Sequence, residues 1–165
     1  MSSQGWAPYV AAIAAVFSGV NLYVAGRRED RSWVRAALEG AFVDFLTACY
    51  DERGACSHMV RLGVEGKTSR RTEEEWQAIA NEAHEVALDC LTRLRVLASD
   101  DTADLARRLM RHTDKSSELA RQQDFVGLKS ALKESTGPFT RDRDLFTARA
   151  RQLLGIRHAG RGRFW

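Results

Sequence analysis

The chain has 165 residues, of which 44% are hydrophobic and 28% charged, with a formal net charge of +3 at pH 7. This balance indicates a folded chain and excludes an intrinsically disordered one. The positive excess is too small to indicate a nucleic-acid partner by itself. The three cysteines, Cys49, Cys56 and Cys90, are odd in number and widely spaced, which argues against a disulfide framework.

The first element in chain order is an uncharged apolar run from Trp6 to Ala25. About twenty helical residues span about 30 Å, the thickness of the hydrocarbon core of a bilayer. Arg27, Arg28 and Arg31 follow the run and no basic residue precedes it. We therefore expect a single-pass cell-membrane anchor in residues 1–26, with the N-terminus outside and the remaining chain in the cytoplasm.

Two alternatives to this anchor stay open. A cleaved signal peptide has a basic segment before a shorter apolar core, and the basic segment is missing here. An amphipathic or buried helix of a soluble protein is the other alternative, because alanine is only weakly apolar. The run is long and uncharged, so the sequence favours the membrane anchor.

Small residues recur every fourth position of the run, at Ala7, Ala11, Ala15 and Gly19. This spacing places them on one helix face, where small side chains let two membrane helices approach closely. The pattern predicts a parallel homodimer through this face. Chance spacing in an alanine-rich helix is the competing interpretation.

The body, residues 27–156, has helical periodicity throughout. Apolar residues follow steps of three and four from Leu38 to Cys56, apart from one skipped turn, with Trp33 widening that face. No proline separates this segment from the apolar run, so we expect one continuous helix. After a polar loop at 63–71, a second helix is expected.

The second helix begins with a capping box, in which Thr72 precedes Glu75 by three residues. Its predicted buried face consists of Trp76, Ile79, Ala83, Val86, Cys90, Leu94 and Leu97. A third helix follows the turn at 99–101, and its thinner, more polar face consists of Leu105, Leu109, His112, Ser116 and Leu119.

A short helical face from Phe125 to Leu132 is expected to end at Gly137 and Pro138. Thr140 is then expected to cap a last helix. No alternation of period two predicts a strand. The sequence therefore predicts an all-α fold, in which one N-terminal transmembrane helix continues into an antiparallel helical bundle of about four helices.

No motif in the chain predicts catalysis or metal binding, and we expect no cofactor. Cys49 and Cys56 lie seven apart, with His58 nearby, but lack the tight spacing of a zinc site, so core packing is the better interpretation. His84 lacks the Glu-x-x-His pattern of a di-iron bundle, because Asn81 stands at the carboxylate position.

His112 lies beside Ser116 on the predicted inward face of the third helix. A buried histidine can act as a general base, but is more often a hydrogen-bonded core residue. Asp114 is expected on the solvated face. The sequence thus assigns no catalytic residue.

The segment 157–165 is predicted to be a basic flexible tail. It contains Arg157, Arg161, Arg163, Phe164 and Trp165. In a tethered protein this tail suits contact with anionic lipid, and arginine with aromatic residues also suits nucleic acid. A solvated end that binds neither is the third interpretation.

The stretches RREDRSWVRAALEGAFVDFL and FTARARQLLGI, with the apolar N-terminal run and the capped helix between them, resemble actinobacterial single-pass membrane proteins that have a C-terminal helical bundle. The resemblance covers most of the chain. The motifs that it rests on are structural, so the resemblance implies the architecture of the chain and does not imply an activity.

The function that these observations favour is a membrane-anchored helical interaction or scaffold module with an unknown protein partner. A small helical-bundle enzyme is one alternative. A membrane-tethered binder of nucleic acid or anionic lipid through the tail is the other, with nucleic acid the less favoured ligand.

Overall fold

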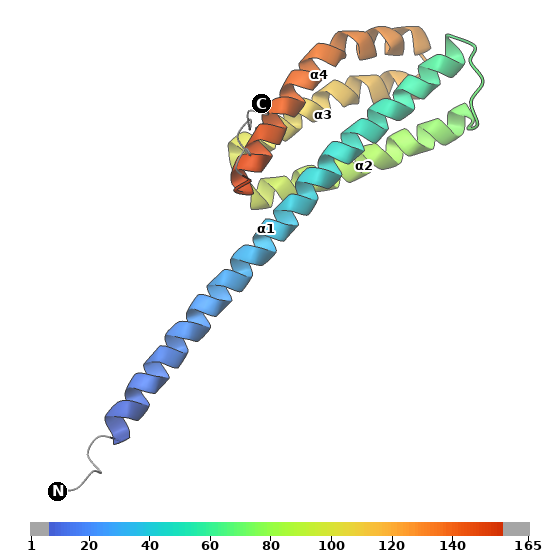
Figure 1. Ribbon diagram of the computed structural model, residues 1–165. Coiled ribbons are helices and arrows are strands. Elements are labelled where there is room, and N and C mark those ends of the chain that lie inside the picture. Colours follow the sequence, from blue (N-terminus) through green and yellow to red (C-terminus); the bar gives the residue numbers. More distant parts are fainter. Residues whose placement is uncertain (1–6, 157–165) are drawn as a thin grey trace, which may run out of the picture. The chain divides into compact units, whose positions relative to one another are not determined.

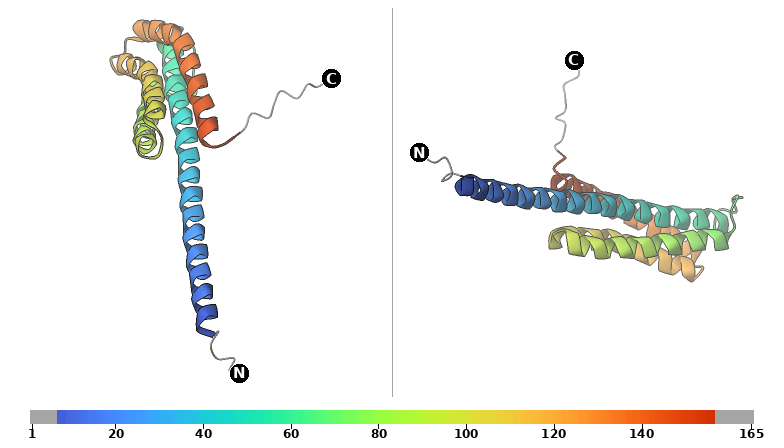
Figure 2. Two further views of the ribbon diagram at one scale, coloured as in Figure 1. Left: turned by 90° about the vertical axis from the view of Figure 1, so that its left-hand side faces the viewer. Right: turned by 90° about the horizontal axis from the view of Figure 1, so that it is seen from below.

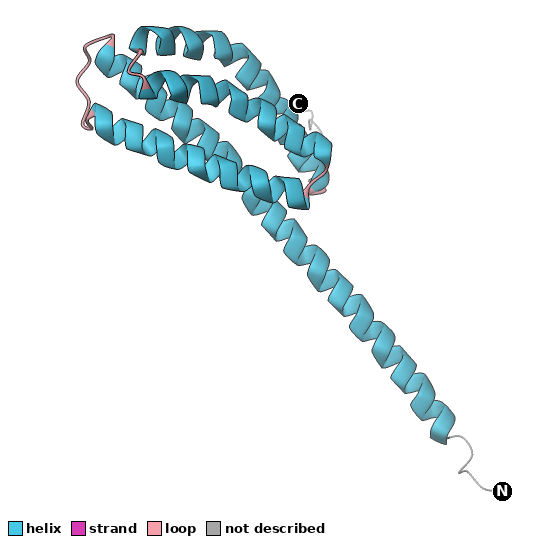
Figure 3. Ribbon diagram, turned by 180° about the vertical axis from the view of Figure 1, so that it is seen from behind, coloured by secondary structure: helices cyan, strands magenta, loops and turns pink. Residues whose placement is uncertain are grey.

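The computed structural model describes the backbone of residues 7–156 and the side chains of residues 32–156. It contains four helices, α1 (Ala7–Gly63), α2 (Glu73–Leu97), α3 (Asp100–Arg121) and α4 (Phe125–Leu153), as Figure 1 shows. Figure 3 shows helices joined by loops, with no strand in the described residues. The predicted all-α class is confirmed.

The chain divides into two compact units, Met1–Ala36 and Ala37–Trp165. Helix α1 is continuous from Ala7 to Gly63, so the apolar run and the first bundle helix belong to one element, as expected. Neither Gly26 nor Gly54 interrupts it. The second unit contains the rest of α1 and the other three helices.

Among the residues whose side chains are described, no helix is long and apolar enough to cross a membrane. The run from Trp6 to Ala25, with its proposed packing face at Ala7, Ala11, Ala15 and Gly19, lies outside those residues. The tail with Arg157, Arg161, Arg163, Phe164 and Trp165 lies outside the described residues as well.

Successive helices of the second unit run in opposite directions and are joined by short connections at 64–72, 98–99 and 122–124. The pairing of α1 with α4 shows the antiparallel register. The ring centroids of Phe42 and Phe146 lie 5.2 Å apart, and those of Tyr50 and Phe139 lie 5.8 Å apart. Figure 2 shows α1 beside α2 and α4 in both views. The predicted antiparallel bundle of four helices is confirmed.

The core follows the predicted steps of three and four along α1. Phe45 and Cys49 are fully buried, and the next positions of the same face bury Cys56 and Met59. Cys90 is buried on α2, and all three cysteines are free thiols. Their predicted role in core packing agrees with these positions.

Some members of the predicted apolar faces are exposed, among them Trp33 and Val86. Trp33 has 66% of its surface accessible and Val86 has 42%. On α2 the buried face consists largely of alanines, among them Ala80, Ala83 and Ala87. Val86 directly precedes the buried Ala87 and lies at the edge of this face.

The capping box at the start of α2 is confirmed. The backbone N–H of Glu75 donates to Thr72 Oγ1 at 3.2 Å, and the backbone N–H of Thr72 donates to Glu75 Oε2 at 2.7 Å. Two N–H groups that a helix start leaves without a helical partner are thereby satisfied.

The expected break at Gly137 and Pro138 is wrong, because α4 is one helix with Pro138 inside it. Figure 1 shows α4 curving along its length, as expected where a proline ring crowds the preceding turn. Arg53 of α1 supports this turn. Its guanidinium donates to Leu132 O at 2.7 Å and to Ser135 Oγ at 2.8 Å.

Tertiary contacts therefore replace the support that the proline removes. The Arg53 guanidinium also donates to Thr136 Oγ1 at 2.8 Å and lies 5.0 Å from the centre of the Phe139 ring. These contacts hold α4 against α1 on both sides of Pro138. Thr140 consequently lies within a helix and caps none.

Candidate functional site

A buried carboxylate lies at the centre of the bundle. Glu52 stands three residues after Cys49 and four before Cys56, on the inward face of α1, and none of its surface is exposed. A buried charge is costly unless it is paired or hydrogen-bonded. The contacts of Glu52 are therefore the first to consider as a candidate site.

Three further side chains surround Glu52, and we call the four residues the Glu52 cluster. His84 of α2 lies with Nδ1 3.1 Å from Glu52 Oε1, and Ser117 of α3 donates its hydroxyl to the same oxygen. Asp114 of α3 completes the cluster, with Oδ1 3.9 Å from His84 Nδ1. The cluster thus joins three helices around one carboxylate oxygen.

The cluster has more acceptors than donors. Glu52 Oε2 and Asp114 Oδ1 are buried and have no hydrogen-bond partner. Burial raises the pKa of Asp114; the charge of His84 opposes this shift, and the charge of Glu52 adds to it. Burial likewise raises the pKa of Cys49 above that of an ordinary thiol, with the charges of Glu52 and Asp114 adding to the effect.

The order of contacts in the cluster determines its chemistry. In a hydrolytic triad the histidine lies between the serine and the acid. Here Glu52 lies between Ser117 and His84, so no imidazole nitrogen is in contact with the serine hydroxyl. Ser117 is also only 3% exposed. The arrangement ties helices together rather than activating a nucleophile.

The three thiols do not form a reactive site either. Cys56 lies 4.0 Å from Ser117 Oγ, and burial raises the pKa of this thiol to about 11. A thiol with a raised pKa is protonated and weakly nucleophilic at neutral pH. Within the described residues, no group of histidine, cysteine and acidic side chains has the arrangement of a metal site.

His112 belongs to a second polar contact, between α3 and α4. Its Nε2 lies 3.0 Å from Asp142 Oδ2, and the Asp142 side chain is only 7% exposed. Burial acts to raise the pKa of Asp142, but the hydrogen bond from His112 outweighs it, together with the charges of His112, Arg108 and Arg141. The net result is a pKa below the ordinary range. His112 is therefore a hydrogen-bonded structural residue.

The structure separates the residues that the sequence singled out. His84 and Cys49 both lie around Glu52, whereas His112 belongs to the contact with Asp142. Asp114, expected on the solvated face, points one oxygen into the Glu52 cluster. His58 stacks on Trp76 with the ring centroids 4.1 Å apart, away from any thiol contact.

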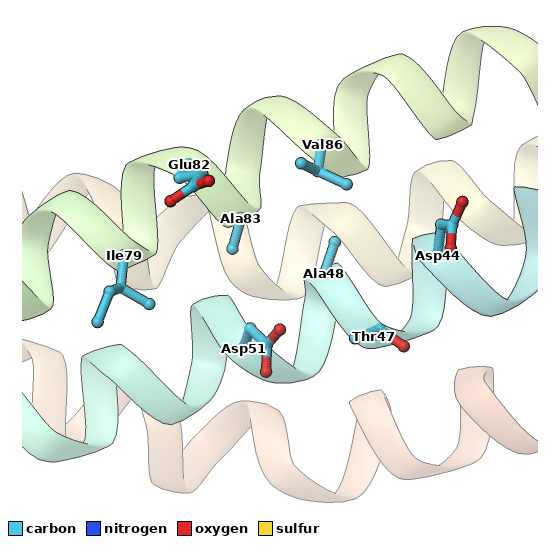
Figure 4. A pocket seen from close by; sticks show the side chains of 8 residues that line it. All are labelled: Asp44, Thr47, Ala48, Asp51, Ile79, Glu82, Ala83 and Val86. Atoms are coloured by element: carbon cyan, nitrogen blue, oxygen red, sulfur yellow. The ribbon is translucent and has the colours of Figure 1, made fainter.

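A groove between α1 and α2 forms a concave surface of the described residues, with a volume of about 330 Å³. Figure 4 shows its side chains arriving from both helices. They are Asp44, Thr47, Ala48 and Asp51 from α1, and Ile79, Glu82, Ala83 and Val86 from α2. We call this surface the α1/α2 groove.

The lining of the α1/α2 groove divides by chemistry. Ala48 and Ala83 are buried at its floor, while Asp44, Asp51 and Glu82 are exposed on its rim. None of these carboxylates forms an ion pair with another described residue. The groove therefore presents an apolar floor between unneutralised negative charges.

Sequence reasoning missed the α1/α2 groove and the central residue of the Glu52 cluster. The position of Glu52 on the periodic face of α1 was the available signal. The comparisons with family models, curated proteins and solved structures give no match for this chain. The functional argument accordingly depends on the geometry alone.

Proposed function

We propose that the protein is a membrane-anchored helical interaction module that binds a protein partner through the α1/α2 groove. The observation that carries the proposal is the groove itself. It is concave, has an apolar floor and keeps three carboxylates that no described cation neutralises. Grooves between two helices commonly receive an amphipathic segment of another protein.

The anchoring half of the proposal is supported by the sequence. The run from Trp6 to Ala25 has the length and composition of a membrane span, and Arg27, Arg28 and Arg31 favour a cytoplasmic body. The described part of the run and the first residues of the bundle belong to one helix, α1 (Ala7–Gly63). A homodimer through Ala7, Ala11, Ala15 and Gly19 belongs to the same proposal.

Membrane association is tested by fractionation after an alkaline carbonate wash, which removes peripheral proteins. The full chain should stay in the membrane pellet. A variant with Ile13→Arg and Val16→Arg should move to the supernatant, because each arginine at the centre of a span costs about 3 kcal/mol. The matched control places arginines at the exposed Val34 and Val43 and should stay in the pellet. An unchanged Ile13→Arg, Val16→Arg variant would refute the anchor.

Orientation is tested by reporters fused to either end of the chain. A reporter that works only outside the cytoplasm should be active at the N-terminus and silent at the C-terminus. The reverse result would contradict the positive-inside assignment.

The interaction is tested by affinity capture from native membranes with a groove variant. Thr47→Arg with Val86→Arg obstructs the α1/α2 groove at two exposed positions. Leu145→Arg with Val126→Arg is the matched control, because both residues are exposed and outside the groove. A partner lost with the groove variant and retained with the control supports the proposal. Equal recovery from both variants contradicts it.

A further inference from the structure

The α1/α2 groove has the chemistry of a surface for a short basic segment with aromatic residues. Its three rim carboxylates come from both helices, with Asp44 and Asp51 on α1 and Glu82 on α2 (Figure 4). Between them, the exposed Val86 adds apolar surface to the alanine floor. An occupant that fits this lining supplies several cations and at least one large apolar side chain.

The segment 157–165 of this chain meets these requirements. It contains Arg157, Arg161 and Arg163, it has no acidic residue, and it includes Phe164 and Trp165. Three arginines match three carboxylates, and arginine pairs with carboxylates through a planar fork of N–H donors. We propose that segment 157–165 docks in the α1/α2 groove of its own chain.

The place where this segment begins makes the docking sterically feasible. Leu154 is buried in the same hydrophobic cluster as Leu38. Because Phe146 packs against Phe42 in the antiparallel pair of α1 and α4, residue 156 leaves the bundle near the level of Leu38. The near end of the groove, at Asp44, is six residues further along α1, which is about 9 Å at 1.5 Å per residue.

The segment is long enough to cover that path. Reaching the α2 side of α1 from α4 adds about one helix diameter, 10 Å. Nine extended residues span at most about 30 Å, which exceeds the sum of both distances. The aromatic residues at 164 and 165 can thus arrive within the groove while the chain remains attached to α4.

Tethering offsets the weakness of the individual contacts. Ion pairs between exposed side chains are weak and are screened by salt. A short linker, however, gives the segment an effective concentration of about millimolar at a surface within its reach. The docked segment therefore acts as a resident occupant that a partner of the groove must displace.

The docking is tested by photo-crosslinking in the full chain. A benzophenone amino acid replaces Phe164, and crosslinks formed on irradiation are located by mass spectrometry. We expect crosslinks to residues 44–51 and 79–86 of the same chain. Mixing copies of normal and heavy isotope composition separates contacts within one chain from contacts between chains. The same probe at the exposed Val126, at the start of α4, is the control and should not reach the groove.

The electrostatic part is tested by neutralising the rim. Asp44→Asn, Asp51→Asn and Glu82→Gln together should reduce the groove crosslinks about tenfold, since three exposed ion pairs are lost. The matched control, Asp100→Asn, Asp101→Asn and Asp104→Asn, removes three carboxylates from α3 and should leave the yield unchanged. At about 1 M salt, where the screening length is about 3 Å, the wild-type yield should also fall.

Three results would overturn the docking. The first is that the probe crosslinks to lipid alone, and the second is that crosslinks form only between heavy and normal copies. The third is that the yield of crosslinks to the groove is the same in the rim variant as in the wild type. The inference uses the groove of the proposed function and is independent of the anchor. Groove-dependent capture of a partner without tail crosslinks would retain the proposed function and refute the tail as occupant.

Discussion

At the scale of single residues, Glu52 is the position on which the bundle should depend most. Removing the acceptor of a buried hydrogen-bonded contact leaves its donors unsatisfied and typically costs about 1–3 kcal/mol. We expect Glu52→Ala to lower the free energy of unfolding by that amount, because His84 and Ser117 both lose their acceptor. Urea denaturation followed by circular dichroism measures the change.

The matched control for Glu52 is Glu74→Ala, an exposed glutamate on α2, which should change the stability by less than about 0.5 kcal/mol. If both variants were equally stable, the assignment of Glu52 as the central tie between helices would be wrong.

Asp142 makes a separate contribution that depends on pH. Its pKa is lowered in the folded chain from an ordinary value of 3.8, so the stabilisation is fully present above pH 3.8. It is lost as the pH falls through the lower folded pKa, because the unfolded chain binds the proton more readily. Asp142→Asn should remove this loss.

The measurement for Asp142 is the urea midpoint at a series of pH values below 5. The wild type should lose stability more steeply than Asp142→Asn as the pH falls. Asp144→Asn is the control, because its carboxylate is exposed and does not contact His112. Parallel curves for the wild type and Asp142→Asn would contradict the prediction.

At the level of residues, the sequence predicted burial correctly where an apolar side chain stands on the buried face of a helix. Cys49 and Cys56 are apolar enough to count as members of a buried face, and both are buried. Glu52 occupies the same face between them, but a pattern of apolar residues does not predict burial of a charged side chain. Those partners, His84 and Ser117, come from other helices, and sequence spacing does not report contacts between helices.

At the scale of elements, α4 shows how tertiary contacts keep a helix continuous through a helix-breaking proline. A proline inside a helix removes one backbone hydrogen bond and crowds the preceding turn, so Gly137 with Pro138 predicted an end. Arg53, about eighty residues away in the chain, binds this turn through its guanidinium. By contrast, the start of α2 was predictable, because Thr72 and Glu75 satisfy each other locally.

Arg53→Met tests the support of α4. The substitution keeps the aliphatic part of the side chain and removes the donors to Leu132, Ser135 and Thr136. Since each charged hydrogen bond contributes about 1–3 kcal/mol and part of the site is solvated, we expect a loss of about 2 kcal/mol. Thermal or urea unfolding measures it. The exposed Arg93→Met should cost less than about 0.5 kcal/mol, and an equal effect of both would disprove the support.

The α2 cap gives a smaller, local prediction. Thr72→Ala removes the side-chain acceptor of the Glu75 N–H and should cost about 1 kcal/mol. Thr92→Ala, at an exposed position nearer the end of the same helix, is the control and should not destabilise the chain, since alanine favours a helix interior. Urea denaturation compares the two, and equal stability of both variants would contradict the cap.

At the scale of the whole molecule, the sequence was sufficient for the all-α class and the antiparallel bundle, although it divided α4 into two helices. Apolar residues that recur at steps of three and four, in segments joined by short polar turns, predict an antiparallel helical bundle. It did not predict the α1/α2 groove, because a groove depends on how two helix faces lie beside each other. Val86 illustrates this limit, since its position in the apolar period predicted burial and the structure places it on the groove.

The proposed homodimer is the remaining prediction at this scale. If Ala11, Ala15 and Gly19 form a packing face between two membrane helices, leucine at all three positions would prevent the close approach that such helices need. We expect the triple substitution to abolish self-association in a membrane two-hybrid assay. The control places leucines at Ile13, Phe17 and Val24, which the helical period assigns to the opposite side, and should leave association intact. Association unaffected by the first set would refute the dimer face, and the anchor would then be expected to act as a single helix.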